Sequence, residues 1–276
     1  MALPTTGLIT LEMVCKEFGK PLPYTMSQLY GAMPGVPTSG MISLMHFYGV
    51  ANTFTLTISN SIASPAIHQL ALNAGWNGSA PLLVIFACPM VNSIRLDSSK
   101  TFPGGLTLQI NAGCFVGGVI NSGTAIFTTV PISINNMGTI AGGGGLGGKG
   151  NSTYVRYSSD PQLVVGQGGQ GGSGQGFNTT STLVVGAAGY GFPGNTATYV
   201  GDVTGVSPWA SGGTGGDGGT WGVVGGTGRS NGSVGGNYSA SGEYVAALQG
   251  APAGKYIEGN SQVTWINKGT VMGNFS

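Results

Sequence analysis

The distribution of glycine is the feature that most constrains what this 276-residue chain can fold into. The chain contains 54 glycines, and 37 of them fall within residues 142–259, where they recur at spacings of two and three. Between the glycine runs lie many tyrosines, phenylalanines and tryptophans. A flexible linker does not carry so many large apolar side chains, and a β-sheet does not tolerate this much glycine. The region therefore needs an ordered structure of another kind.

An extended helix with three residues per turn accepts such a sequence. Its backbone makes no internal hydrogen bonds, so neighbouring helices can bond to one another where glycine permits close approach. We predict that 142–259 forms a sandwich of polyglycine II helices, a rigid head in which the non-glycine stretches are loops at the ends. The alternative is a disordered low-complexity insert.

The low charge of the chain excludes several classes of protein. Charged residues make up 6% of the chain, and the net charge is +1, whereas about 25% is usual. A nucleic-acid partner is not expected, because phosphate binding needs clustered Lys and Arg. Membrane insertion and export are not expected either, since no long apolar run or signal peptide is present. Cys15, Cys88 and Cys114 lack paired spacing, which favours buried reduced thiols over disulfides.

Residues 1–50 contain a short internal repeat. Each unit places Thr or Ser before a short mixed stretch and ends in an aromatic residue followed by glycine. The hydroxyl suits a helix N-cap and the glycine a C-cap, so we expect short helical turns. Because such small elements bury little surface alone, we expect them to dock on a larger partner through Phe18, Tyr30, Phe47 and Tyr48. The alternative is an extension that packs back on its own domain.

Residues 51–141 have the pattern of β-strands. Phe54, Leu56 and Ile58 alternate with Thr and Ser, residues 93–97 and 106–110 alternate again, and the apolar run 82–86 is typical of a fully buried strand. Turn residues separate these runs, and β-branched residues are abundant within them. The segment is therefore expected to be all β.

A second repeat links this segment to the last residues of the chain. Residues 110–117, 134–142 and 266–273 each contain a strand, an Asn-containing turn, a second strand and glycine. Stacked units of this kind suit a β-solenoid or a sandwich. We predict a mainly β protein in which a base at 51–141 is completed by 260–276. The glycine-rich region is then an excursion from this base.

These motifs resemble those of a known protein family. The stretch Asn135-Asn136-Met137-Gly138-Thr139-Ile140, which leads into the glycine run, is similar to phage tail-fibre and tail-tip proteins. The later glycine runs resemble the distal tail-fibre adhesins of T-even-like phages, and residues 42–49 and 263–270 also look similar to phage tail proteins. The resemblance implies a polyglycine II head whose loops contact receptors on the bacterial surface.

The resemblance also implies where recognition takes place. Trp and Tyr dominate binding hot spots, so aromatic residues between the glycine runs are the candidates for contacts with a host outer-surface protein or glycan. We expect receptor contacts from Tyr154, Arg156, Tyr157, Tyr190, Phe192, Tyr199, Trp209, Arg229, Tyr238 and Tyr244. For each aromatic residue, packing inside the sandwich is an equal alternative.

The same resemblance implies a place on the virion, at the tail tip or tail fibre, after assembly in the host cytoplasm. Residues 1–50 would attach the chain to other phage tail or tail-fibre proteins. Assembly as a homotrimer is left open. A structural virion decoration or head fibre is the alternative function, because it has the same assembly requirements.

Catalysis is not expected from this sequence. His46 and His68 are the only histidines, and neither has a Cys or carboxylate at ligand spacing, so no metal or other cofactor is expected. A glycosidase needs two carboxylates that flank the scissile bond. Since Asp160, Asp202, Asp217 and Glu243 could supply such a pair, a polysaccharide depolymerase is a less favoured alternative.

Overall fold

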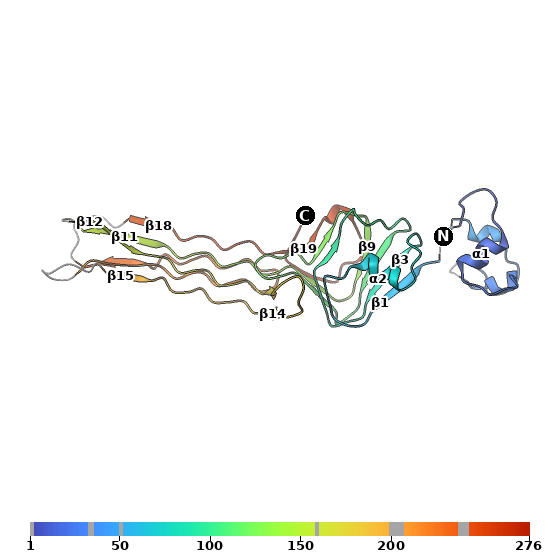
Figure 1. Ribbon diagram of the computed structural model, residues 1–276, viewed down its shortest axis with the longest axis horizontal. Coiled ribbons are helices and arrows are strands. Elements are labelled where there is room, and N and C mark those ends of the chain that lie inside the picture. The colour runs from blue at the N-terminus through green and yellow to red at the C-terminus, as the bar shows by residue number, and fades with distance from the viewer. Residues whose placement is uncertain (1–2, 33–35, 50–51, 158–159, 199–206, 237–242) are drawn as a thin grey trace.

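The computed structural model describes residues 3–32, 36–49, 52–157, 160–198, 207–236 and 243–276. Figure 1 shows three parts in line: a small helical N-terminal part, a β-rich base and a long, narrow head that points away from both. The fold is mainly β, which confirms the prediction from sequence.

The N-terminal part is built from three capped helical turns: α1 (Leu11–Glu17), η1 (Met26–Leu29) and η2 (Leu44–Phe47). The hydroxyl oxygen of Thr10 accepts the backbone N–H of Met13 at 3.2 Å, and that of Ser43 accepts the N–H of Met45 at 3.2 Å. The glycine that ends each unit has a positive φ: +61° at Gly19, +61° at Gly31 and +70° at Gly49. The predicted caps and turns are confirmed.

This part also has a hydrophobic core of its own, formed by Leu3, Ile9, Val14, Cys15, Leu29, Val36 and Phe47. The expectation that such elements bury little surface alone is therefore wrong. The reason is that the repeated units pool their apolar residues, and the ring of Phe18 packs edge-on against that of Phe47 at 5.7 Å.

The base is a three-sided solenoid of parallel strands with five successive rungs. Its sheets have the strand orders β1-β3-β6-β9-β20, β2-β4-β7-β10-β21 and β22-β19-β8-β5. The strands of the first three rungs are β1 (Phe54–Ile58), β2 (Ile62–Ala63), β3 (Leu82–Phe86), β4 (Met90–Asn92), β5 (Ile94–Leu96), β6 (Leu106–Ile110), β7 (Phe115–Gly117) and β8 (Ile126–Thr128). In the first rung, helix α2 (Ile67–Asn73) follows β2 where later rungs have a third strand.

The last two rungs complete the solenoid and include the C-terminal residues. Their strands are β9 (Ile132–Asn136), β10 (Thr139–Ala141), β19 (Lys255–Glu258), β20 (Val263–Asn267), β21 (Thr270–Met272) and β22 (Asn274–Phe275), with the turn η3 (Asn260–Gln262) between β19 and β20. The repeated strand–Asn turn–strand units are therefore β6–β7, β9–β10 and β20–β21, stacked in parallel.

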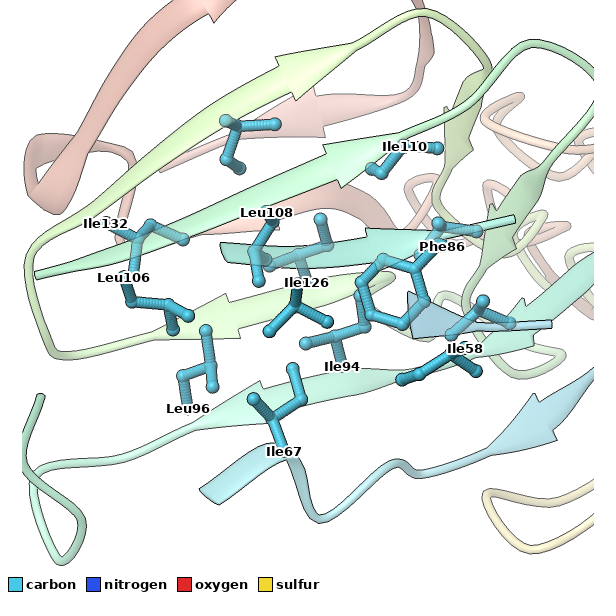
Figure 2. Packing of buried hydrophobic residues seen from close by; sticks show 14 of the residues in the cluster. Ile58, Ile67, Phe86, Ile94, Leu96, Leu106, Leu108, Ile110, Ile126 and Ile132 are labelled. Carbon is cyan, nitrogen blue, oxygen red and sulfur yellow. The ribbon is translucent and has the colours of Figure 1, made fainter. Parts of the chain in front are cut away.

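In-register stacking builds the core of the base. Val84 pairs with Leu108, and Leu108 pairs with Ile134, so equivalent inward residues lie one above another and all three are fully buried. Figure 2 shows this interior, where apolar side chains from β1, β3, β6 and β9 meet those from β5, β8 and α2. These residues alternate with polar ones in β6 and β9, whereas all five residues of β3 are apolar. In each of these strands every second residue points into the core.

The head leaves the base after β10 and returns at β19 in the same rung. The expected boundary of the head at residue 259 is wrong, because Lys255–Glu258 pairs with β8 and β22 as a strand of the base. This four-residue strand, Lys-Tyr-Ile-Glu, has no alternation by which the sequence could have revealed it. The excursion therefore covers residues 142–254.

Six extended segments fill the length of the head, and backbone hydrogen bonds arrange them in two layers of three. One layer has the order 166–176, 142–151 and 245–254, and the other has the order 187–195, 211–221 and 222–230. The first residues of each segment lie at the end of the head opposite to those of its neighbour within the layer. Segments 142–151 and 211–221 are central, and each bonds to four others.

The hydrogen bonds between segments repeat every three residues. The N–H groups of Gly144, Gly147 and Gly150 donate to the carbonyl oxygens of residues 175, 172 and 169, at 2.7–2.9 Å. A Cβ at Gly171 would lie 1.8 Å from the carbonyl oxygen of Gly147, although Gly171 has no positive φ. Glycine is thus required by the close approach of backbones. This spacing supports the polyglycine II conformation, which itself remains a prediction.

Aromatic packing and a side-chain amide hold the head against the base. The ring of Trp221 lies between Phe115 of β7, at 4.9 Å, and Phe177 of β13 (Gly176–Phe177), at 5.7 Å. Strand β13 pairs with β14 (Val185–Gly186). In the turn between them, two carbonyl oxygens accept hydrogen bonds from the fully buried side chain of Asn92. These contacts fix the position of the head on the base.

Candidate functional site

Two small antiparallel sheets form the far end of the head. One contains β12 (Asp160–Gly166), β11 (Ser152–Tyr157) and β18 (Glu243–Val245), and the other contains β15 (Thr196–Thr198), β16 (Trp209–Ser211) and β17 (Ser233–Gly235). They share a compact apolar cluster of Val155, Val164 and Ala210. The stretches predicted as loops are therefore partly strands, because β-branched and aromatic residues replace glycine there.

Trp209 stabilises this end of the head. It pairs with Gly235 across the β16–β17 ladder, and its half-buried ring lies so close that a Cβ at Gly235 would be 2.6 Å from ring atoms. Tyr154, on β11, is also half-buried. Both residues were candidates for receptor contacts, and both have a packing role as well.

Tyr244 lies at the edge of its sheet. It pairs with the buried Thr153 in the β11–β18 ladder, and 59% of its surface is exposed. An exposed tyrosine on a strand edge can contact a partner without disturbing the apolar cluster. The structure thus leaves Tyr244 available for recognition.

Two other candidates lie along the flank of the head. Tyr190 is 85% exposed and Phe192 is 61% exposed, and both belong to the outer segment 187–195. The backbone beneath them is held on both sides: the N–H of Phe192 donates to Gln170 at 2.9 Å, and its carbonyl oxygen accepts from Gly215 at 2.9 Å. The N–H of Gly191 donates to the Asp217 carboxylate at 2.8 Å. The rings are thus exposed on an immobilised main chain.

Arg229 is placed in a comparable way on another outer segment. Its side chain is exposed, while its N–H donates to the carbonyl oxygen of Thr214 at 2.7 Å and its own carbonyl oxygen accepts from Asn151 at 3.2 Å. Tyr199 and Tyr238 lie outside the described residues, as do the side chains of Arg156 and Tyr157.

Exposed aliphatic residues on the head were not predicted as site residues. Val184, Val224 and Leu248 each expose more than half of their surface. The three-residue repeat of the head could have identified them, because a side chain that does not face a neighbouring segment must face solvent. Aliphatic residues were passed over because Trp and Tyr are the usual hot-spot residues.

The four candidates for attachment in the N-terminal part differ in how deeply they are buried. Phe47 is fully buried in the core of the N-terminal part, so its ring has no surface to offer a partner. Tyr48 donates its hydroxyl to the carbonyl oxygen of Gly7 at 2.6 Å, and Tyr30 donates to that of Gly40. Phe18, Tyr30 and Tyr48 are partly exposed or at the surface and remain candidates for attachment.

Both histidines make contacts that stabilise the fold. His46 caps its own turn, where its Nδ1 accepts the N–H of Ser43 at 3.1 Å, and His68 packs edge-on against Trp76 and Phe102. Within the described part of the chain, no three His, Cys, Asp or Glu side chains gather as a metal site would need. No described helix is long and apolar enough to cross a membrane.

The solenoid base, the glycine head and the capped N-terminal turns together define a mainly β protein that carries a long, narrow head on a solenoid base. A comparison with protein families matches residues 53–276 to the family described as phage tail fibre adhesin Gp38. The chain belongs to this family: it is a phage tail-fibre adhesin, and its place is on the tail fibre of the virion.

Comparison with solved structures gives a more distant similarity. The chain is similar to the gp37-gp38 adhesin tip complex of the bacteriophage S16 long tail fiber, with 16% sequence identity and a TM-score of 0.43. The match covers 99% of this chain and 95% of that chain. Comparison with curated proteins gives no match.

Proposed function

We propose that the exposed side chains of the head bind a protein or glycan on the surface of the host bacterium, and that the chain acts by binding alone, without catalysis. The observation that carries this proposal is the pair Tyr190 and Phe192, which expose most of their surface on a backbone bonded to both neighbouring segments. Membership of a tail-fibre adhesin family supports it.

Rigid presentation favours binding for a physical reason. Binding costs conformational entropy when side chains and loops become ordered, and a main chain that is already fixed avoids most of that cost. Aromatic rings add large contact areas with few rotatable bonds. Tyr244 and Arg229 would extend the same contact surface toward the far end of the head.

The N-terminal part is proposed to attach the chain to another tail-fibre protein, in assembly within the host cytoplasm. Phe18, Tyr30 and Tyr48 are the candidates, since Phe47 is buried. Whether the chain is single or a homotrimer in solution is tested by its mass in light scattering.

Substitution of the exposed rings tests the proposed receptor contact. Purified wild-type protein is expected to bind host cells and to block phage adsorption, and the double variant Tyr190→Ala with Phe192→Ala is expected to lose at least tenfold in both. Gln170→Ala, at an exposed position on the adjacent segment, is the matched control. Equal binding by the double variant and wild type would place the contact elsewhere, and no binding by folded wild type would reject the adhesive role of the head.

A separate assay tests the absence of catalysis. Among the candidate acids, the Asp217 carboxylate is engaged by the N–H of Gly191, and Asp202 lies outside the described residues. Incubation with host surface polysaccharide should release no reducing ends above the level of a heat-denatured sample. Release that disappears in Asp217→Asn would establish a depolymerase instead.

A further inference from the structure

A row of three unlike side chains crosses one outer face of the base. Arg95 of β5 pairs with Phe127 of β8, and Phe127 pairs with Glu258 of β19, so the three lie in register on successive rungs. The guanidinium carbon of Arg95 lies 4.1 Å from the centre of the Phe127 ring. In a chain with only 6% charged residues, two opposite charges around one ring form an uncommon grouping.

These residues line a hollow with a volume of about 360 Å³. We call it the corner hollow; its polar walls are Ser64, Ser93, Arg95, Thr124, Thr180 and Glu258, and Phe127 is the aromatic wall. Pockets that hold small ligands have volumes of roughly 300–1,000 Å³. The corner hollow therefore has room for one small polar ligand.

The backbone around the corner hollow is fixed and in part unusual. Ser64 and Ser93 have φ of +45° and +49°, in the left-handed region that side chains rarely adopt. The hydroxyl of Ser64 donates to the carbonyl oxygen of Thr180 at 2.6 Å, and that of Ser93 donates to the Oδ1 of Asn92 at 2.9 Å. Both serine oxygens are thus held in place with acceptor lone pairs left over.

Arg95 supplies the donors of the corner hollow. Its side chain makes no hydrogen bond or ion pair with any described residue, and its guanidinium lies over the ring of Phe127. Such a stacked guanidinium presents a rigid fork that matches a carboxylate or phosphate. Glu258 is paired with Lys255 at 3.3 Å. The pKa of Asp97 is lowered, first by its hydrogen bonds from Ser99 and in smaller part by the charge of Arg95, but no ion pair joins Arg95 to either carboxylate among the described residues.

We propose that the corner hollow binds one acidic saccharide unit, whose carboxylate or phosphate pairs with Arg95. Ligand hydroxyls then donate to the oxygens of Ser64, Ser93 and Glu258, which complements the donors supplied by Arg95. The site lies on the base, with the turn between β13 and β14 of the head as one wall. It is separate from the proposed receptor contact at the exposed rings of the head and does not depend on it.

Calorimetric titration of the full chain tests this site with four probes: glucuronic acid, glucose 6-phosphate, glucose and inorganic phosphate. We expect the two acidic sugars to bind at least tenfold more tightly than glucose and phosphate. Arg95→Gln is expected to abolish that preference, and Arg95→Lys, which keeps the charge without the fork, to lose part of it. Lys100→Gln, which removes an exposed positive charge elsewhere on the base, is the matched control and should bind like wild type.

Five results would overturn the proposal. If glucose bound as tightly as the acidic sugars, the anionic group would not contribute to binding. If inorganic phosphate bound as tightly as the acidic sugars, the sugar hydroxyls would not contribute. Unchanged binding by a folded Arg95→Gln variant, or no binding of either acidic sugar to wild type, would reject the corner hollow as a site. Binding of the acidic sugars that is lost in Tyr190→Ala instead would assign it to the head.

Discussion

The indole ring of Trp221 lies edge-on against the ring of Phe115, with ring centroids 4.9 Å apart and an interplanar angle of 66°. Phe115 belongs to the solenoid and Trp221 to the last residues of a head segment, so this contact joins the two parts. Truncation of a fully buried Trp to Ala commonly costs about 3–5 kcal/mol, and the half-buried Trp221 should lose less than that. At a junction, that loss should appear as independent motion of the head.

Trp221→Ala is therefore expected to loosen the head from the base while both stay folded. Hydrogen exchange should speed up in residues 118–123 and 176–186, next to the junction, and remain slow around Val84 in the solenoid core. Tyr190→Ala, at an exposed ring, serves as the control. Unchanged exchange near the junction in Trp221→Ala would show that the backbone bonds alone hold the head.

Gly171→Ala should be far more destabilising than a change at its neighbour Gln170. A Cβ at position 171 would lie 1.8 Å from the carbonyl oxygen of Gly147, so the two segments would have to separate. Overpacking commonly costs about 1–3 kcal/mol, and each kcal/mol lowers the melting temperature by roughly 2–4 °C in a chain of this size. Thermal unfolding of Gly171→Ala and Gln170→Ala checks this. Equal melting temperatures would contradict the close approach of the segments.

Asn92→Ala is expected to release the turn between β13 and β14. The amide of Asn92 donates to the carbonyl oxygens of Thr179 and Thr182, at 2.7 and 2.6 Å. Loss of a partner inside a protein costs about 1–3 kcal/mol for each group left unsatisfied. Limited proteolysis should cut residues 178–184 faster in Asn92→Ala than in Asn73→Ala, a control on the exposed side of α2. Equal cleavage would mean that the turn is held by other contacts.

Alkaline pH should destabilise the base through Cys114. Burial, followed by the nearby thiol of Cys88, raises the pKa of Cys114 from 9.0 to about 12. The unfolded chain releases this proton at lower pH than the folded one. The contribution to stability is therefore complete below pH 9 and is lost as the pH rises toward 12, by at most ~1.4 kcal/mol per pH unit.

Urea unfolding at pH 8 and at pH 10.5 measures this loss. The midpoint should fall more steeply for wild type than for Cys114→Ala, in which the group is absent. At pH 8, iodoacetamide should modify Cys114 much faster in urea than in buffer. Parallel pH dependence of the two proteins would show that Cys114 does not titrate between 9 and 12.

Much of the fold followed from local patterns in the sequence. Thr10 and Ser43 revealed the N-terminal turns, because a helix cap needs a hydroxyl at a fixed offset. The recurrence of Ile, Asn and Gly in β6–β7, β9–β10 and β20–β21 revealed stacked units, because one repeat generates one rung.

The candidate site was harder to predict, for a physical reason. In strands, alternation separates buried from exposed residues, but the glycine segments have few side chains that could show such a pattern. Trp209 and Tyr190 therefore looked alike in the sequence, although one packs on Gly235 and the other is 85% exposed. Arg95 and Glu258 are 163 positions apart, and only the solenoid brings them to one face.

The layered arrangement of the head has a mechanical consequence. Its six segments run along the long axis, and the hydrogen bonds between them cross that axis. The first and last residues of the head both join the base at the same end of the head. When the far end is held and the fibre pulls on the base, the load acts as shear along the rows of bonds. Many bonds then share the force and must break together, so a head rich in the smallest residue can transmit tension without extending.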